Sequence, residues 1–294
     1  MGQISSKLAA RFRDSGKYRR RIREQAKQIR ESSPVLSDVN SIEQCIESGL
    51  EPLHAAYVAT QNFVSFFAEQ VSILKELEPY YQIVSKAEDE YMPSGPPMSP
   101  LTGSYFTTWA FFDVRFGPDA ETIGTCLLDT GKELGMDDGM LLTTRLMQYT
   151  RMGIYEHCGR TGSTVQLREL TTGDRFACHV PTGYLGVEGE IWYVRLCPPI
   201  LDAVDYHIVL TTPYILGGST KADWVAYLKK QLLGASDQRT ALRELLKYGT
   251  QPNHWNEFVF RAYHHHHPEV IFLAGLPDVQ GSLPHASLLS RDED

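Results

Sequence analysis

Two adjacent histidine–cysteine pairs come closest to a metal site in residue type and spacing. His157-Cys158 and Cys178-His179 together offer two imidazoles and two thiols, a ligand set that tetrahedral Zn²⁺ accepts. Both pairs fall in segments with the character of β-strands, where neighbouring residues point to opposite faces. Each pair therefore offers one ligand to any one side, and in a simple meander the two strands would lie about 10 Å apart. The pattern favours ordinary strand residues over a zinc centre.

A run of four histidines, from His264 to His267, is the second group of potential ligands. If the helix expected from Trp255 continues through the run, His264 and His267 share a face and could bind a transition metal. The alternative is a surface helix end, where cationic side chains lie near the negative end of the helix dipole. Both interpretations predict adventitious nickel binding.

Motifs for common catalytic chemistry are absent from the sequence. It contains no nucleophile elbow, P-loop, dinucleotide fingerprint or HExxH pattern. The segment Gly217-Gly218-Ser219-Thr220 precedes an expected helix, but without the P-loop lysine it is typical of a helix cap. We therefore predict no cofactor and favour a non-enzymatic role. A metal-dependent enzyme that uses the histidine run or the acidic cluster at residues 88–90 is kept as an alternative.

Aromatic residues in the expected β region suggest a binding surface, since barrel faces bind extended peptides or bases by stacking. The candidates are Tyr184, Trp192 and Tyr193, with Tyr206 nearby in the sequence. Strand alternation places Trp192 and Tyr193 on opposite faces. We expect one of them in the core and the other available to a partner.

The amino-terminal segment is strongly basic. Residues 1–30 contain ten basic and two acidic side chains, a local charge of +8, so that a chain with a net charge of −8 carries −16 elsewhere. An acidic body repels phosphate backbones, so attraction to RNA or to anionic lipid must come from this arm. Its candidate contacts are Arg19, Arg20, Arg21 and Arg23.

The same segment admits several interpretations. Met1-Gly2 followed by Ser5-Ser6 fits the myristoylation pattern, and one acyl chain with a polybasic segment can anchor a protein to a membrane. Ile4, Leu8 and Phe12 recur at helical spacing, which gives an apolar stripe too narrow to form a core alone. A solvated arm and a helix docked on the acidic body are the alternatives.

Periodicity and turn residues predict the remaining elements. A long helix begins near Pro52 and is ended or kinked at Pro79, and four prolines in residues 93–100 indicate a linker. The aromatic segment 105–112 is typical of a buried strand, and helices follow over 122–134 and 137–151. Further helices are expected over 224–233, from Asp237 to 247 and from Trp255, with a last strand over 270–273.

Five short strands separated by glycine-bearing turns occupy the middle of the chain, at 154–158, 164–169, 174–180, 190–197 and 206–210. This spacing predicts a small five-stranded antiparallel barrel of SH3-like or OB-like type, and hence an α+β fold with amino-terminal and carboxy-terminal helices. The predicted organisation is a basic helical arm (1–33), a helical hairpin region (34–92), a Pro-rich linker (93–103), a strand plus helices (104–153), the barrel (154–216), C-terminal helices (217–277) and a loose tail (278–294).

Residues 109–196 carry a partial resemblance to a family. The matching pieces are Phe111-Phe112-Asp113, Glu121-Thr122-Ile123, residues 151–156 (RMGIYE), residues 167–173 (LRELTTG) and residues 189–196 (GEIWYVRL). They resemble uncharacterised bacterial proteins with a helical region and a small β module, some of which carry a SEC-C tail. The cysteine and histidine signature of that tail is absent here. The resemblance implies a bacterial origin and a barrel, and it implies no activity.

Composition completes the sequence-based prediction. The five cysteines form no CxxC pair, no apolar run reaches the roughly 18 residues of a membrane span, and no signal core follows Met1. We therefore expect a cytoplasmic protein, with peripheral membrane association as an option. The leading functional prediction is a protein-interaction or scaffold module that binds another protein. The alternative is lipid or RNA association through residues 1–30.

Overall fold

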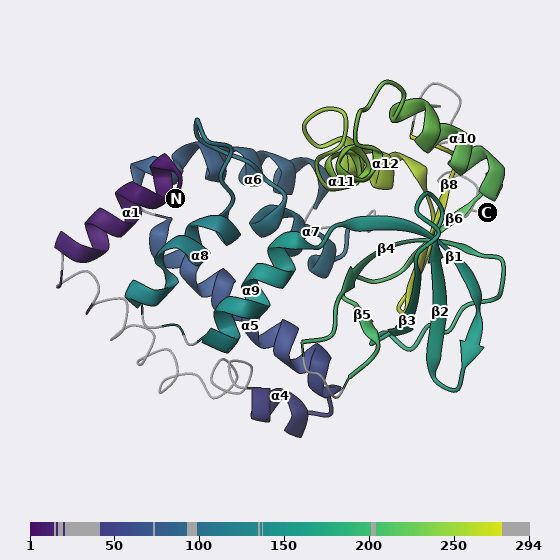
Figure 1. The fold of residues 1–294 in the computed structure, drawn as a ribbon, viewed down its shortest axis with the longest axis horizontal. Coiled ribbons are helices and arrows are strands. Elements are labelled where there is room, and N and C mark those ends of the chain that lie inside the picture. Colours follow the sequence, from purple (N-terminus) through teal and green to yellow (C-terminus); the bar gives the residue numbers. More distant parts are fainter. Residues whose placement is uncertain are drawn as a thin grey trace, which may run out of the picture. The chain divides into compact units, whose positions relative to one another are not determined.

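The computed structural model describes residues 1–14, 16, 20, 42–72, 74–92, 99–134, 136, 138–200 and 204–277 (Figure 1). Within the chain, contacts define two compact units. The helical unit consists of Met1–Lys86 and Thr107–Thr150, with a short stretch that begins at Ile200. The barrel unit consists of Ala87–Phe106, Arg151–Pro199 and the chain from residue 203 onward. The predicted linker, of which residues 93–98 lie outside the described part, belongs to the barrel unit.

The helical unit contains α1 (Gln3–Asp14), α4 (Ile42–Glu47), α5 (Pro52–Val71), the 3₁₀ helix η1 (Lys75–Leu77), α8 (Ile123–Leu134) and α9 (Asp138–Tyr149). Two further helices, α6 (Glu78–Tyr91) and α7 (Gly103–Phe112), contribute residues to both units. Helices α5, α8 and α9 pack on one another, and α1 packs on α8. The helix predicted from Pro52 ends at Val71, before Pro79, and Pro79 lies in the first turn of α6, where the missing amide hydrogen costs little.

The predicted strand over 105–112 is wrong, because this segment forms α7. The side chains of Tyr105, Ala110 and Phe112 are all buried, so the helix is apolar around most of its circumference. A short apolar run of this kind does not distinguish a buried helix from a buried strand. The local helix signal is Thr102, whose Oγ1 accepts a hydrogen bond from the amide of Tyr105 at 3.3 Å.

The barrel unit confirms the predicted small barrel and the α+β fold. Strands β1 (Met152–Thr161), β2 (Thr164–Glu169), β3 (Arg175–His179), β5 (His207–Val209) and β4 (Ile191–Cys197) follow one another in space, and pairing of β1 with β4 closes the ring (Figure 1). The barrel is mixed, since β3 and β5 run parallel, whereas the sequence predicted a wholly antiparallel one. Gly162 and Gly173 have φ values of 62° and 75° in the turns between β1, β2 and β3. Glycine adopts this left-handed conformation without strain.

Three more strands extend the sheet from β4: β6 (Tyr214–Gly217), then β8 (Val270–Ala274), and at the edge β7 (Tyr263–His267). The predicted last strand is therefore β8. The helix expected to continue through the histidine run is wrong, because α12 ends at Ala262 and the run forms β7, which pairs antiparallel with β8. His264 and His267 do not share a helix face.

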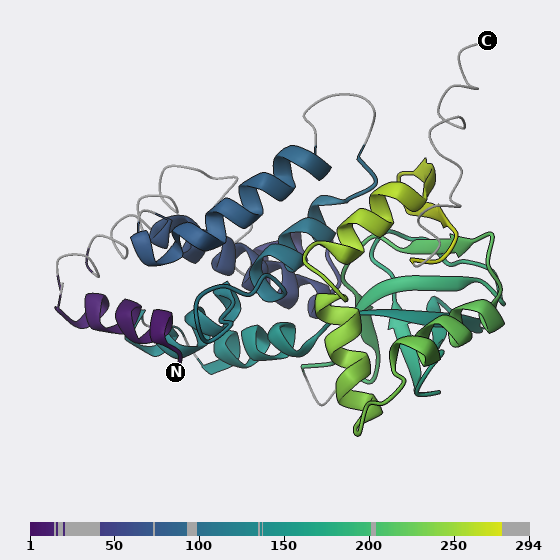
Figure 2. The same ribbon diagram turned by 90° about the horizontal axis from the view of Figure 1, so that it is seen from above.

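The carboxy-terminal helices are α10 (Lys221–Gln231), α11 (Gln238–Tyr248) and α12 (His254–Ala262), and Figure 2 shows them following one another beside the strands of the barrel unit. Their starts confirm local sequence signals. Thr220 and Asp223 form a reciprocal capping box at α10, and the carboxylate of Asp237 accepts bonds from the amides of Arg239 and Thr240 at α11. The cap at Asp237 holds the start of α11, which borders the site described next.

Several predictions fall on residues outside the described part of the chain. They concern most of the basic arm, including Arg19, Arg21 and Arg23, and the tail over 278–294. Arg20 is described, as an exposed helical residue. Among the described helices, none is long and apolar enough to cross a membrane.

Candidate interaction site

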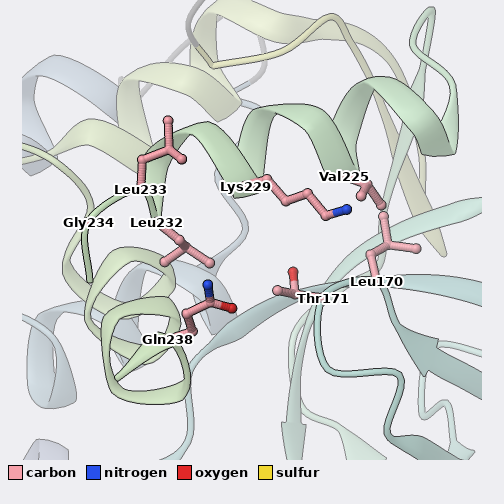
Figure 3. Close-up of a pocket in the computed structure, with 8 residues that line it drawn as sticks. All are labelled: Leu170, Thr171, Val225, Lys229, Leu232, Leu233, Gly234 and Gln238. Carbon is pink, nitrogen blue, oxygen red and sulfur yellow. The ribbon is translucent and has the colours of Figure 1, made fainter. Parts of the chain in front are cut away.

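A shallow pocket of about 320 Å³ lies in the barrel unit between the end of α10, the start of α11 and the turn after β2 (Figure 3). Figure 3 shows side chains of α10 on one side of it and the turn residues Leu170 and Thr171 on the other. Its volume is at the lower end of the roughly 300–1,000 Å³ typical of small-molecule sites. Its lining combines leucine and valine side chains with polar groups in about equal measure, namely Leu170, Thr171, Val225, Lys229, Leu232, Leu233, Gly234 and Gln238.

The turn that carries the lining residues Leu170 and Thr171 is held by an ion pair with a buried carboxylate. Arg151 Nη2 donates to Glu169 Oε1 at 2.8 Å, and Thr172 Oγ1 donates to Glu169 Oε2 at 2.8 Å. Glu169 is buried at the end of β2, and both oxygens of its carboxylate have hydrogen-bond partners. These bonds hold the turn that carries Leu170 and Thr171 in one conformation.

The opposite wall is tied to the barrel at both ends. At the start of α10, Lys221 Nζ donates to Glu156 Oε2 at 2.7 Å, and Arg168 donates to the same oxygen. Burial raises the pKa of Glu156, but the bonds from Lys221 and Arg168 outweigh it and the net shift is downward. At the start of α11, Arg239 lies 3.6 Å from Asp174. Ion pairs therefore connect both helices that border the pocket to the barrel.

The rim of the pocket is apolar and cationic. Leu233 is 80% exposed, the largest exposed fraction among the big hydrophobic side chains of the described residues. It follows the last turn of α10 and precedes Gly234, whose φ of 82° turns the chain toward α11. Lys229 is exposed and has no acidic partner among the residues that the structure describes. The sequence-based predictions did not include this site, although the pair Leu232-Leu233 before Gly234 places one leucine outside the buried stripe of the helix.

The aromatic residues proposed as a binding surface are placed elsewhere. Trp192 and Tyr193 are both fully buried, so the prediction that one of them faces a partner is wrong. Trp192 lies in the barrel core, and Tyr193 on the other face packs against Trp255 of α12 with ring centroids 5.2 Å apart. The helix covers the outer face of β4, which strand alternation alone could not show.

Tyr184 is half-buried and belongs to the same network as Trp192. Both donate to Glu190, from Tyr184 Oη to Oε1 at 2.8 Å and from Trp192 Nε1 to Oε2 at 3.0 Å. The tyrosine and tryptophan rings lie 5.5 Å apart. Because these polar groups satisfy one another, the cluster serves to close the loop between β3 and β4 over the barrel core.

The histidine–cysteine pairs do not converge. His157 accepts a bond at Nδ1 from the amide of Gly159 and bonds through Nε2 to the carbonyl of Leu185, whereas Cys178 lies in the barrel core. No group of three or more His, Cys, Asp or Glu side chains that could hold a metal ion occurs among the described residues.

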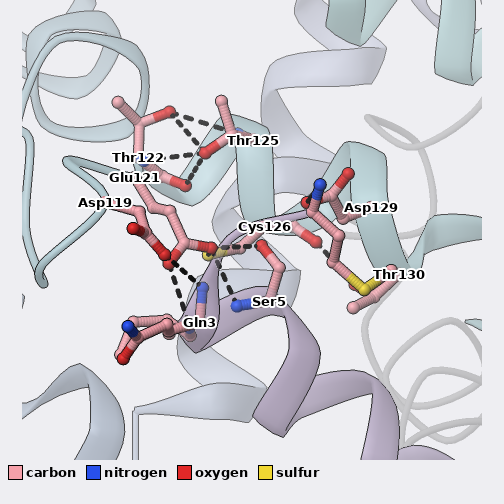
Figure 4. A network of polar contacts seen from close by, with 11 residues as sticks. Gln3, Ser5, Asp119, Glu121, Thr122, Thr125, Cys126, Asp129 and Thr130 are labelled. Carbon is pink, nitrogen blue, oxygen red and sulfur yellow. Dashed lines mark hydrogen bonds and ion pairs between the residues drawn. The ribbon is translucent and has the colours of Figure 1, made fainter.

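A second polar network holds the amino terminus in the helical unit (Figure 4). Glu121 accepts bonds from the amides of Ile4 and Ser5, both at 2.8 Å, and from Ser5 Oγ at 2.5 Å. A carboxylate at this point satisfies the unpaired amides of α1 and its positive dipole end. A Cβ on Gly2 would lie 2.2 Å from Cδ of Glu121, so packing requires glycine there. Burial raises the pKa of the neighbouring Cys126 to about 12, which makes its thiol unreactive.

The described part of the basic arm is docked on this unit. Leu8 and Phe12 are fully buried, Arg11 pairs with Glu76 at 2.9 Å, and Arg13 lies 3.4 Å from Glu133. The apolar stripe of α1 therefore belongs to the core of the helical unit, as one of the sequence-based alternatives anticipated. The myristoylation pattern at Gly2 stays one of the sequence-based alternatives.

The chain matches no family model, no curated protein and no solved structure. The resemblance of residues 109–196 to bacterial proteins therefore stays a prediction.

Proposed function

We propose that this protein is a non-enzymatic interaction module, and that the α10–α11 pocket binds an extended segment of a partner protein. The observation that carries the proposal is Leu233, a large apolar side chain that is 80% exposed and lines a pocket of mixed polar and apolar character. Exposed apolar groups beside a preformed pocket are typical of interaction sites, whereas scattered single ones need no explanation.

The charge at the rim selects the chemistry of the segment. Lys229 lines the pocket, and no described acidic residue neutralises it. A leucine or similar side chain would fill the hollow against Leu170 and Val225, and an adjacent carboxylate would meet the lysine. We therefore propose an acidic peptide with apolar anchors as the ligand. Charge complementarity of this kind sets specificity and association rate more than affinity.

The proposal is tested with short synthetic peptides and full-length protein in fluorescence polarisation. Peptides with two leucines followed by acidic residues should bind, while peptides with lysines in place of the acidic residues, or serines in place of the leucines, should not. Leu233→Asp should weaken binding at least about 10-fold, the effect of losing an apolar anchor worth about 1.4 kcal/mol. Lys229→Glu should weaken it less and reduce its dependence on salt.

Val187→Asp is the matched control, because Val187 is also a strongly exposed apolar residue of the barrel unit, 66% exposed, and does not line the pocket. Its affinity should equal that of the unmodified protein. The proposal fails if acidic and basic peptides bind alike, or if Val187→Asp weakens binding as much as Leu233→Asp.

The alternative, association with anionic lipid or RNA through the basic arm, requires a different variant. Deleting residues 1–30 would remove Leu8 and Phe12 from the core of the helical unit. Replacing Arg19, Arg20, Arg21 and Arg23 with glutamine tests the arm without that loss. Binding to anionic vesicles that disappears in this variant and at high salt would favour the arm over the pocket.

A further inference from the structure

The four histidines from His264 to His267 lie in strand β7, at the edge of the sheet. His265, His266 and His267 pair in register with Phe272, Ile271 and Val270 of β8, and a register shift between Tyr263 and His265 leaves His264 unpaired in a bulge. Alternation then places His265 and His267 on one face and His266 on the other. Both His265 and His267 are exposed.

The two exposed imidazoles lie close enough to serve one ion. Their ring centroids are 4.6 Å apart. A metal ion lies about 2.0–2.1 Å from a coordinating imidazole nitrogen, which places two ring centres about 4.5–5 Å apart when both bind it at an angle near 90–110°. The observed centroid spacing falls in this range, with the two ring planes at 88° to each other.

The ring of Phe272 supports the pair. Its centroid lies 6.4 Å from that of His265, in a stacked arrangement, and 5.9 Å from that of His267. Phe272 itself packs against the barrel core, so one wall of the imidazole pair is fixed. Rotamers limited in this way lose less entropy when a ligand binds.

We propose that His265 and His267 form a two-ligand site for a divalent transition metal of the Cu²⁺, Ni²⁺ or Zn²⁺ type. Imidazole nitrogen suits these ions, whereas Mg²⁺ and Ca²⁺ require oxygen ligands. Because the described residues supply no third His, Cys, Asp or Glu to the group, the remaining coordination positions are open to water or to a donor from another molecule. This site is independent of the proposed peptide pocket.

The other two histidines of the run provide internal controls. His264 lies in the bulge, outside the pairing that aligns His265 and His267. His266 is half-buried on the opposite face, and its Nδ1 is enclosed without a hydrogen-bond partner among the described residues. If strand geometry forms the site, metal affinity should not depend on His264 or His266. If any histidine-rich stretch binds the ion, metal affinity should depend on all four histidines equally.

The test is isothermal titration of Ni²⁺ and Zn²⁺ into the full chain, prepared without a purification tag. His265→Ala and His267→Ala should each weaken binding at least about 10-fold, since losing a ligand should cost no less than the 10–100-fold typical of an outer-shell partner. His264→Ala and His266→Ala should bind like the unmodified protein. Phe272→Leu should bind more weakly than the unmodified protein but more tightly than either ligand variant.

Circular dichroism of each variant shows whether the fold is retained, and the exposure of His265 and His267 predicts that it is. Broadening of individual histidine signals by Cu²⁺ in NMR spectra gives a second readout, which should affect His265 and His267 first. The proposal is overturned if the unmodified chain binds neither ion, or if all four alanine variants lose affinity to the same extent.

Discussion

Two helical segments of this protein combine leucine or phenylalanine with basic side chains, and they differ in how far these side chains are buried and paired. In α1, Leu8 and Phe12 are fully buried, and Arg11 and Arg13 pair with acidic residues of the same unit. At the end of α10, Leu233 is 80% exposed, and Lys229 meets no acidic partner among the described residues.

The difference separates a structural helix from a candidate interface. Burial of apolar area stabilises the fold, and a basic residue that already has a carboxylate partner offers little to a ligand. By sequence alone, α1 is the more conspicuous segment, because it opens a stretch with a local charge of +8. Once packing is considered, the region beside the α10–α11 pocket combines a strongly exposed leucine with a lysine that lines the same pocket.

The largest expected effect that tests this comparison is on stability. Phe12→Ala should lower the free energy of unfolding by about 3–5 kcal/mol, the usual cost of deleting a fully buried phenylalanine side chain. Leu233→Ala should change it by less than about 0.5 kcal/mol, as for most surface positions. Urea unfolding followed by far-UV circular dichroism measures both.

Leu142→Ala is the control for the helical unit, because Leu142 lies on α9 and is 43% exposed. It should resemble Leu233→Ala. If Phe12→Ala proved as stable as these two surface variants, α1 would not be part of the core, and the basic arm would again be the better candidate for an interface.

A smaller loss is expected when the carboxylate that holds α1 is removed. Glu121→Ala should cost about 2–3 kcal/mol, because buried amides and a hydroxyl lose a charged acceptor. Gly2→Val should be destabilising as well, since its Cβ would overlap with Glu121. Thermal unfolding of both variants measures the effect.

Gly103→Ala serves as the matched glycine control, because a Cβ there meets no atom within 4 Å. Its melting temperature should stay close to that of the unmodified protein. Equal melting temperatures for Gly2→Val and Gly103→Ala would contradict the docking of the amino terminus on Glu121.

The elements predicted correctly from the sequence are those whose signals are local. The capping box of Thr220 and Asp223, the cap at Asp237 and the turn glycines Gly162 and Gly173 depend on residues within a few positions of one another. These features placed α10, α11 and the first barrel strands. The composition of segment 105–112 misled the prediction, because a run of aromatic residues suits a buried helix as well as a strand.

The candidate sites depend on contacts that spacing does not reveal. Glu121 and Ser5 are 116 positions apart, and the face of Tyr193 is covered by Trp255 of a later helix. The histidine run carried no such local signal, because Pro268-Glu269 is not one of the glycine-bearing dipeptides typical of a two-residue hairpin turn. Its pairing with β8 therefore had to come from the structure.

The smallest expected effect is the difference between the two units in how their stability changes as the pH is lowered. In the helical unit, a hydrogen bond from Arg11 lowers the pKa of Glu76 from its ordinary 4.5, so its contribution is present above that pH and is lost as the pH falls further. In the barrel unit, burial lowers the pKa of His207 from its ordinary 6.5. The unfolded state then binds more protons than the folded state, and stability decreases as the pH falls below 6.5.

Between about pH 7.5 and about pH 5.5, only the barrel unit should therefore weaken through these groups. Tryptophan fluorescence reports this, since Trp192, Trp224 and Trp255 belong to the barrel unit, and Trp109→Phe removes the signal of the helical unit. In Trp109→Phe, the urea concentration at the unfolding midpoint should decrease as the pH is lowered. The decrease should be smaller when His207→Phe is added, because phenylalanine keeps the packing against Phe176 but takes up no proton. An equal decrease in both proteins would show that protonation of His207 does not cause the loss of stability of the barrel unit at lower pH.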